Sequence, residues 1–421
     1  MNYIPNISFA IALLIGIGFF VRNVLKLVRN INLGKELDRS DRKTQRWKNM
    51  ARIALGQSKM VSRPIAGFLH IIVYVGFIII NIEVLEIIID GLFGTHRVFQ
   101  PLFGNSIYGF LIGTFEILAF LVLVAVIIFW LRRNIVQLKR FMSKEMKGWP
   151  KNDGNLILYF EIVLMSLFIL MNATDDSFQQ AGFGNPISQF VAPWFSEYPL
   201  ETLSSIEHTA WWAHIIGILI FLNYLYYSKH LHILLAFPNT FYANLQPKGQ
   251  FNNLSSVTKE VRMMMDPDVD PYAMPDEGTE EEIPEKFGAS HVTDLNWVQL
   301  LNAYTCTECG RCTSSCPANM TGKELSPRAI MMKTRDRLEE VGRNIDSNKG
   351  TFKDDGKQLL NDYITPEELW ACTSCNACVE ECPIDIDPLS IIMDMRRFLV
   401  MEQSAAPQEL NMMMTNIENN G

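Results

Sequence analysis

Cysteine is confined to one short part of this 421-residue chain, with none before residue 306 and none after residue 382. All eight cysteines fall within two runs, so none is left over for a disulfide framework. The chain also lacks a nucleic-acid signature, since its Lys and Arg residues gather beside apolar segments without aromatic-bearing binding motifs. These absences exclude a disulfide-stapled secreted protein, and we expect no nucleic-acid partner.

The two cysteine runs share the pattern Cys-x2-Cys-x2-Cys-x3-Cys-Pro. This spacing is typical of segments that bind [4Fe–4S] clusters, in which soft thiolates hold iron and the fourth cysteine ligates the neighbouring cluster. We therefore predict two clusters with crossed ligands: Cys306, Cys309, Cys312 and Cys382 for one, and Cys372, Cys375, Cys378 and Cys316 for the other. Disulfides or structural zinc are the alternatives, but neither requires this spacing and neither predicts it twice.

Five segments are long and apolar enough to cross a hydrocarbon core of roughly 30 Å. They run at about Ile4–Leu27, Pro64–Ile89, Ile107–Leu131, Asn155–Met171 and Thr209–Phe237. A cleaved signal peptide is a poor interpretation of the first segment, because basic residues follow its apolar run and it has no small-residue cleavage site. The sequence therefore predicts an all-α membrane protein, with five transmembrane helices followed by a small, mainly α, ferredoxin-like dicluster domain.

The loops between these segments differ strongly in charge. Ten Lys or Arg residues lie between Arg29 and Arg63 and seven between Arg132 and Lys151, whereas the other two loops together hold only Arg97. This positive-inside bias places the amino terminus outside and both basic loops in the cytoplasm. Cluster thiolates also need a reducing compartment. We expect a multi-pass protein of a bacterial or archaeal cytoplasmic membrane, with its iron–sulfur domain in the cytoplasm.

The character of the sequence changes after Pro238. Residues 1–237 are predicted to form the membrane domain, 238–290 an irregular connector with the acidic run Asp276–Glu282, 291–400 the dicluster domain, and 401–421 a tail that could dock a partner. Helical periodicity after a Ser-Pro start predicts a helix over Ser326–Glu340, and Thr365-Pro366 opens another.

A histidine within an apolar segment costs free energy in a bilayer, and such histidines are usually functional. His70 lies in the second segment, and His214 and His232 lie in the fifth, where 18 residues of continuous helix would put them on one face about 27 Å apart. His70 and His232 would then share one depth near the cytoplasm and could ligate a b-type haem. The alternative is hydrogen bonding between helices. A second haem on His214 would need a partner near residues 77–83, where no histidine occurs.

Acidic residues also lie within the apolar segments. Glu83, Glu86 and Glu116, together with His214, are candidates for proton exchange beside a quinone. The alternative is that the carboxyl groups are protonated and hydrogen-bond neighbouring helices. We expect the quinone pocket near His70 on the cytoplasmic side, and a pocket at Glu83 and His214 is the alternative.

Two sets of motifs resemble known families. The segments Arg63-Pro64-x2-Gly67-Phe68-x-His70 and His214-x17-His232, with Ser228-Lys229 and a following Pro238, resemble the five-helix haem b subunit of respiratory nitrate reductase. The resemblance is closer to the related membrane subunits of heterodisulfide-reductase-like and electron-transfer-flavoprotein:quinone-reductase-like complexes. The first cysteine run, continued by Gly322-Lys323-x-Leu325-Ser326-Pro327-Arg328, resembles the dicluster module of the same group. Together these resemblances cover nearly the whole chain.

The resemblance implies an electron-transfer subunit of a membrane oxidoreductase. Haem ligands in the family come from the second and fifth helices, which supports His70, His214 and His232 here. Many family members contain, or bind, CCG domains that carry out the substrate chemistry, and no Cys-Cys-Gly occurs in this chain. Electrons would pass between a CCG-domain partner, which could oxidise electron-transfer flavoprotein, and membrane quinone. A membrane-anchored redox sensor or assembly scaffold with structural clusters is the alternative.

Overall fold

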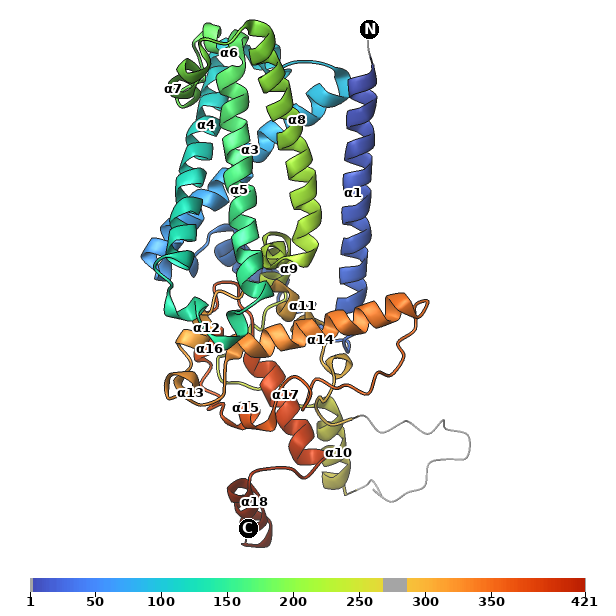
Figure 1. Cartoon of the computed structure of the whole chain (residues 1–421). Helices are drawn as coiled ribbons and strands as arrows, with labels where there is room; N and C mark the ends of the chain where they lie inside the picture. Colours follow the sequence, from blue (N-terminus) through green and yellow to red (C-terminus); the bar gives the residue numbers. More distant parts are fainter. Residues whose placement is uncertain (1–2, 268–285, 421) are drawn as a thin grey trace. The chain divides into compact units, whose positions relative to one another are not determined.

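The computed structural model describes residues 3–267 and 286–420 (Figure 1). Helices make up the regular structure of these residues, which contain no β-strand and only two isolated bridges, Lys35 with Asn296 and Leu360 with Ile364. The all-α class predicted from the sequence is confirmed. The chain divides into two compact units. The first comprises Met1–Lys26 and Gly56–Leu231, and the second comprises Leu27–Leu55 and His232–Gly421.

Five helices are long and apolar enough to cross a membrane, as the sequence predicted. They are Ile4–Ile31 (α1), Pro64–Phe93 (α3), Phe99–Asn134 (α4), Trp149–Thr174 (α5) and the stretch Leu200–Tyr227, which contains α8 (Leu200–Tyr224). In the first unit, α3 packs on α4, α4 on α5 and α5 on α8 (Figure 1). Two short helices, α6 (Asp176–Ala181) and α7 (Ser188–Val191), follow α5 at one end of this bundle.

The bundle is held together by large apolar side chains. Tyr108 and Phe115 of α4 and Phe168 of α5 are fully buried in one cluster, which also receives Ile80 from α3 and Ala210 from α8. Because four helices contribute to one cluster, the polar groups at its edges are held at fixed depths within the bundle.

The fifth membrane helix is interrupted, contrary to the sequence prediction of one helix over Thr209–Phe237. After α8, two 3-10 turns at Leu225–Tyr227 and Lys229–Leu231 flank an extended Ser228, and α9 begins at His232 and ends at Phe241. The Asp153 carboxylate accepts hydrogen bonds from the Lys229 backbone N–H (3.1 Å) and the Tyr224 hydroxyl (2.6 Å) and so satisfies groups that the break releases. The argument that His214 and His232 share one continuous helix face is therefore wrong.

The second unit is built from short helices around the cysteine runs. They are α2 (Lys43–Met50), α9, α10 (Ser255–Met265), α11 (Trp297–Thr305), α12 (Arg311–Ser314), α13 (Pro317–Met320), α14 (Pro327–Ser347), α15 (Pro366–Trp370), α16 (Ala377–Glu381), α17 (Pro388–Met401) and α18 (Gln408–Asn420). Ser326 caps α14 and Thr365 forms a capping box with Glu368 on α15, so both predicted helix starts are confirmed.

The loop between the first two membrane helices belongs to this second unit. The Lys35 backbone pairs with the chain at Leu295 (2.8 Å) and Trp297 (3.1 Å). A side chain at Gly34 would collide with that backbone, since its Cβ would lie 2.7 Å from Trp297 N. Arg46 is fully buried and donates to the carbonyl oxygens of Ala243 (3.0 Å) and Phe241 (3.2 Å). The predicted domain boundaries at 237, 290 and 400 stay predictions. The second compact unit also includes Leu27–Leu55, which precede all three boundaries.

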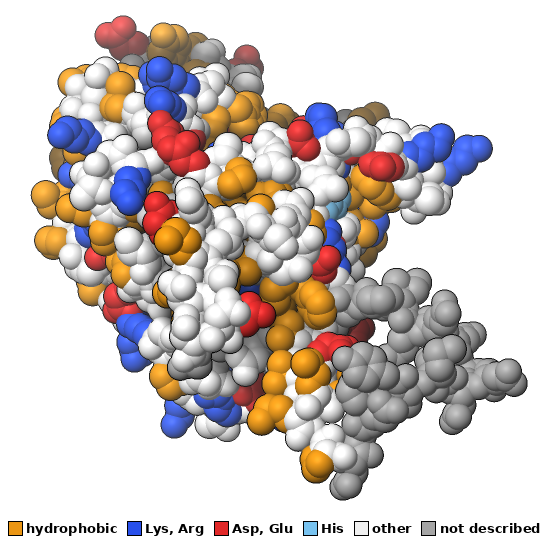
Figure 2. Space-filling view, turned by 90° about the horizontal axis from the view of Figure 1, so that it is seen from below, with side chains coloured by type: hydrophobic (Ala, Val, Ile, Leu, Met, Phe, Trp, Pro, Cys, Tyr) orange, Lys and Arg blue, Asp and Glu red, His pale blue; other side chains and the backbone are white. Residues whose placement is uncertain are grey.

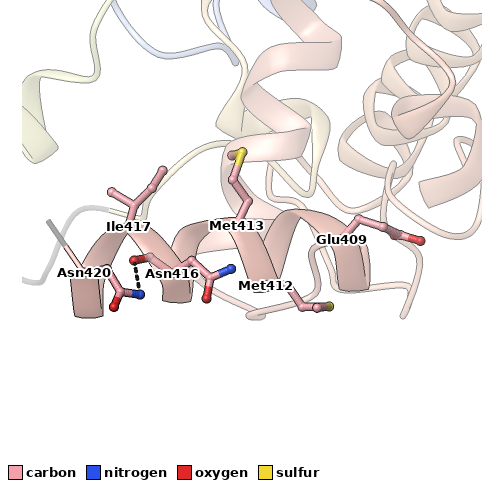
Figure 3. A pocket seen from close by; sticks show the side chains of 6 residues that line it. All are labelled: Glu409, Met412, Met413, Asn416, Ile417 and Asn420. Carbon is pink, nitrogen blue, oxygen red and sulfur yellow. Dashed lines mark hydrogen bonds between the residues drawn. The ribbon is translucent and has the colours of Figure 1, made fainter.

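Two further segments differ from the sequence prediction. The connector contains regular structure, because α9 continues through Pro238 and α10 follows. Its acidic run Asp276–Glu282 lies outside the described residues. The tail forms α18, which buries no residue. Figure 3 shows a shallow pocket on this helix, lined by Glu409, Met412, Met413, Asn416, Ile417 and Asn420. Figure 2, seen from below, shows hydrophobic, basic and acidic side chains interspersed over the visible face.

Arg337 joins α14 to the segment that follows this helix. Its guanidinium is fully buried and donates to both carboxylate oxygens of Asp355 (2.7 Å each) and to the Lys357 carbonyl (2.7 Å). These hydrogen bonds lower the pKa of Asp355 to about 2. The segment after α14 is thereby fastened to the helix.

Arg337→Met should reduce the free energy of unfolding of this unit by about 2 kcal/mol, because Asp355 keeps some contact with water but loses its partner. Arg343→Met, on the same helix, is the control. Arg343 is mostly exposed and forms a surface ion pair with Glu339, so about 0.5 kcal/mol or less is expected. Denaturant unfolding followed by tryptophan fluorescence measures both, and equal losses would contradict the role of Arg337.

Candidate iron–sulfur centre and buried polar sites

The two cysteine runs adopt the same backbone conformation. In each run, the second and fourth residues after the first cysteine are left-handed: Glu308 and Gly310 in the first run, Ser374 and Asn376 in the second. Left-handed backbone is costly for residues other than glycine, so its repetition at matching positions indicates a shared constraint. A loop that curls around one centre supplies this constraint. The third cysteine of each run then lies on a short helix, Cys312 on α12 and Cys378 on α16.

The fourth cysteine of each run lies beside the other run. Burial raises the pKa of the Cys382 thiol, and the nearby thiols of Cys309 and Cys306 raise it further. Burial likewise raises the pKa of Cys378 to about 12, with Cys372 and Cys316 among its neighbours. These neighbours, together with the packing of α12 on α16, favour the crossed assignment. We call Cys306, Cys309, Cys312 and Cys382 the first cluster site, and Cys372, Cys375, Cys378 and Cys316 the second.

Backbone N–H groups and half-buried cations complement the sulfur atoms. Ile386 N–H points at Cys382 Sγ (3.3 Å) and Ser374 N–H at Cys372 Sγ (3.4 Å), contacts that stabilise thiolates and tune a bound cluster. Arg335 pairs with the buried Glu308 at 2.8 Å, and Arg396 donates to the Cys372 carbonyl (2.5 Å). The donor set therefore fits two iron–sulfur clusters. Among the described residues, no group of three or more His, Cys, Asp or Glu side chains could hold a metal ion by itself, and a cubane spreads its four thiolates over four irons.

The two cluster sites differ in exposure. Cys306, Cys316 and Cys382 are buried, whereas Cys375 is exposed and the remaining cysteines are half-buried. This asymmetry could not be predicted, because the two runs are identical in spacing. Nor did the sequence indicate Arg335, Arg396 or Ile386, which approach the sites from outside the cysteine runs.

His214 has the environment of a ligand-binding imidazole. It is buried on α8, and its Nδ1 lies 3.0 Å from the carbonyl oxygen of Leu164 on α5. A carbonyl only accepts, so Nδ1 carries the proton and Nε2 keeps its lone pair for a metal or another donor. A backbone carbonyl that orients the ring in this way is common behind metal-bound histidines.

The other histidines are distributed over both units. His70 lies on α3 in the first unit, and His232 begins α9 in the second, so their pairing around one haem stays a prediction. His230 Nε2 lies 3.7 Å from the half-buried Glu161 carboxylate, and the His230 ring packs on Phe221.

The predicted membrane acids have different environments. Glu86 accepts from Phe99 N–H (2.9 Å) and the Tyr108 hydroxyl (3.1 Å). Glu116 accepts from Asn172 and from the backbone N–H groups of residues 187 and 188. Glu83 is also buried, but its Oε2 has no hydrogen-bond partner among the described residues. Glu86 and Glu116 thus join helices, whereas Glu83 keeps an acceptor available for a proton or a ligand.

A polar network beside these acids could not be recognised from the sequence. Arg97 is paired with Asp175 at 2.9 Å and also donates to Asn172 (3.0 Å) and Tyr108 (3.3 Å). Since Tyr108 also binds Glu86, and Asn172 also binds Glu116, one arginine connects both structural acids. In the sequence, Arg97 is distinguished only as the single basic residue of the two loops that are poor in Lys and Arg.

The fold and the cysteine sites define an all-α membrane protein with an iron–sulfur domain. Residues 305–386 match the family model of the 4Fe-4S dicluster domain. Among curated proteins, the chain is 28% identical to a probable iron-sulfur-binding oxidoreductase, FadF, of Bacillus subtilis, over 96% of this chain and 56% of the relative. It is 25% identical to the EtfAB:quinone oxidoreductase of Syntrophomonas wolfei, over 91% of this chain and 53% of the relative.

A third similarity is limited to the cysteine-rich part. A CoB-CoM heterodisulfide reductase polypeptide of Methanosarcina acetivorans is 31% identical over 26% of this chain and 53% of the relative. No solved structure matches the chain. The chain spans about half the length of the FadF and EtfAB:quinone oxidoreductase relatives. It is thus similar to iron–sulfur oxidoreductases.

The crossed ligation predicts an unusual mutational result. Cys316→Ala should remove or convert the cluster at the second site, although Cys316 belongs to the first cysteine run, because the fourth thiolate ligates the other cube. Cys382→Ala should do the same at the first site and is the matched control. EPR of anaerobically reduced protein separates the two signals, and damage confined to the first site in Cys316→Ala would contradict crossing.

Proposed function

We propose that this chain is the electron-transfer part of a quinone-linked membrane oxidoreductase. Electrons would pass between a CCG-domain iron–sulfur partner and membrane quinone through two [4Fe–4S] clusters and haem b. The proposal rests on the connectivity of the chain. The apolar bundle continues at His232 directly into the compact unit that contains all eight cysteines. Bound clusters would supply one-electron chemistry, and the chain's residues hold and shield them.

The similarity to relatives supports the quinone link. One relative is named an EtfAB:quinone oxidoreductase and matches this chain over nearly its full length. On this basis we propose that the soluble partner oxidises electron-transfer flavoprotein. The positive-inside bias supports a cytoplasmic position for the dicluster unit, where such a donor would reach it.

Haem b is proposed on the chemistry of three histidines. His70 and His232 are the proposed axial ligands, and His214 is the second choice for a ligand on the fifth segment. The Nε2 lone pair of His214, whose ring is oriented by Leu164, suits a haem iron, and it could instead accept a hydrogen bond from the hydroxyl of a quinol.

A reduced-minus-oxidised spectrum of the purified protein should show a b-type α band. His70→Ala and His232→Ala should each abolish it, because each removes one axial ligand of the same iron. His230→Ala is the matched control and should retain it, since His230 faces Glu161. A band that survives His232→Ala but not His214→Ala would transfer the second ligand to His214, and a haem-free preparation with intact clusters would refute the haem.

We propose that the quinone site lies at Glu83 and His214. The sequence favoured a pocket near His70, with Glu83 and His214 as the alternative. Glu83 has a buried oxygen without a partner among the described residues, and His214 has an oriented lone pair. Both lie in the first unit, and reduction of a quinone consumes two protons. We therefore propose that Glu83 delivers a proton and that His214 contacts the quinone or the haem.

Glu83→Gln should slow the reoxidation of dithionite-reduced protein by a soluble quinone analogue about a hundredfold, the typical contribution of a positioned general acid. Glu86→Gln is the matched control one turn away. Its amide can still accept from Phe99 N–H, so the rate should change little. Stopped-flow absorbance measures both rates. Equal rates in the two variants, with intact clusters, would return the site to the His70 end.

A further inference from the structure

The loop that follows Cys382 is fastened to α9 by buried asparagines. Asn239 of α9 is fully buried, and its Nδ2 donates to the Ile384 carbonyl at 2.7 Å. Ile386 N–H in turn points at Cys382 Sγ (3.3 Å). One side chain of α9 therefore holds the peptide segment that presents an N–H group to a ligand of the first cluster site.

Asn302 of α11 completes this attachment. Its Nδ2 donates to Asn239 Oδ1 (3.1 Å) and its Oδ1 accepts from Asp387 N–H (2.7 Å). Asn302 is 3% exposed. Both amides thus have partners at each end, which defines their orientation. A buried polar pair that is fully hydrogen-bonded fixes one arrangement, because any other leaves groups unsatisfied.

A third asparagine reaches the same loop from α2. Asn49 Nδ2 donates to Asp385 (3.0 Å) and to the Thr240 carbonyl of α9 (2.8 Å). α9 follows the fifth membrane segment directly, and α2 lies in the loop between the first two. The loop after Cys382 is therefore held by the two parts of the second unit that are closest in sequence to membrane helices.

The second cluster site is the more exposed of the two, although its Cys316 is buried. Its Cys375 is exposed, as are Thr373 and Glu380 in the same run. The segment after Cys316, which corresponds to the loop after Cys382, is the short helix α13, with Pro317 and the 72%-exposed Met320 at the surface. A soluble redox partner can approach this site without displacing a packed helix.

We propose that the two clusters work in a fixed order, with the first site exchanging electrons with the membrane part and the second with the soluble partner. Asn239 and Asn302 are positioning residues that set the geometry and potential of the first site. A hydrogen-bonded route leads from Cys382 through Ile384 and Asn239 into α9, whose first residue, His232, lies about 10 Å along the helix. This order rests on the proposed function, since it requires a membrane acceptor.

The positioning role is tested by redox titration followed by EPR. Asn239→Ala and Asn302→Ala should shift the midpoint potential of the first site and leave the second unchanged, since hydrogen bonds near the sulfur atoms tune a cluster. Asn244→Ala is the matched control, because Asn244 is exposed and accepts a local hydrogen bond from Gln246 N–H. Cys309→Ser and Cys375→Ser identify the two signals. A shift at the second site, or none in either asparagine variant, overturns the positioning role.

The order is tested on the unaltered protein by rapid freeze-quench EPR. Fully reduced protein is mixed with a membrane-soluble quinone analogue or with ferricyanide, a water-soluble oxidant. Each cluster gives up one electron, and two electrons with two protons convert one quinone to quinol. The quinone should oxidise the first site first, and ferricyanide the second. Asn239→Ala should slow only the quinone reaction, by about tenfold, the lower range for loss of an outer-shell contact.

The possible outcomes distinguish a failure of the proposed order from a failure of the proposed function. If quinone oxidises the second site first, or if both oxidants give one order, the proposed order is wrong while the quinone-linked function stands. If ferricyanide oxidises both clusters and quinone oxidises neither, the proposed function fails and the order fails with it. The potential shift in the asparagine variants then still decides whether α9 positions the first site.

Discussion

We propose that crossed ligation is the constraint on which the second unit depends. If the fourth thiolate of each run serves the other site, neither site is complete until both runs have folded against each other. The left-handed residues at matching positions, the packing of α12 on α16, and the placement of Cys382 beside Cys306 and Cys309 all fit this requirement. The short helices between the runs then act as spacers. Their capping residues, Ser326 and Thr365, fix where each begins and so fix the distance between the runs.

In the membrane-spanning unit, the corresponding constraint is that polar groups in an apolar environment need partners. Asp153 supports the break after α8, and Arg97 pairs with Asp175 and donates to Tyr108 and Asn172, which in turn bind Glu86 and Glu116. Against this background Glu83 is exceptional within the described part of the chain, because neighbouring acids are satisfied and one of its oxygens is not. A buried carboxyl group in this state destabilises the bundle, and such a cost is typically found where a site binds a ligand or transfers protons.

The cysteine runs and the five apolar segments could be recognised from the sequence because each depends on spacing or composition within a short stretch. The interruption at Leu225–Leu231 could not, because the carboxylate that stabilises it, Asp153, is 76 residues from Lys229. For the same reason the sequence did not show which acids are satisfied: the donors to Glu116 lie 56 to 72 residues away. The unequal exposure of the two cluster sites could not be predicted either, because the two motifs have the same spacing but pack against different neighbours.

The participation of Leu27–Leu55 in the second unit has a consequence for how the protein is assembled and handled. Asn30 donates to Tyr304, Lys35 pairs with the backbone around Asn296, and Arg46 fills a buried position against Ala243. A fragment that starts at Pro238 would expose these three surfaces, and it would lose the buried Arg46 while keeping the carbonyl oxygens that accept from it. During synthesis, the first basic loop emerges long before these partners, which follow 197 to 274 residues later. The iron–sulfur unit is thus discontinuous, and a water-soluble version of it would need both pieces of the chain.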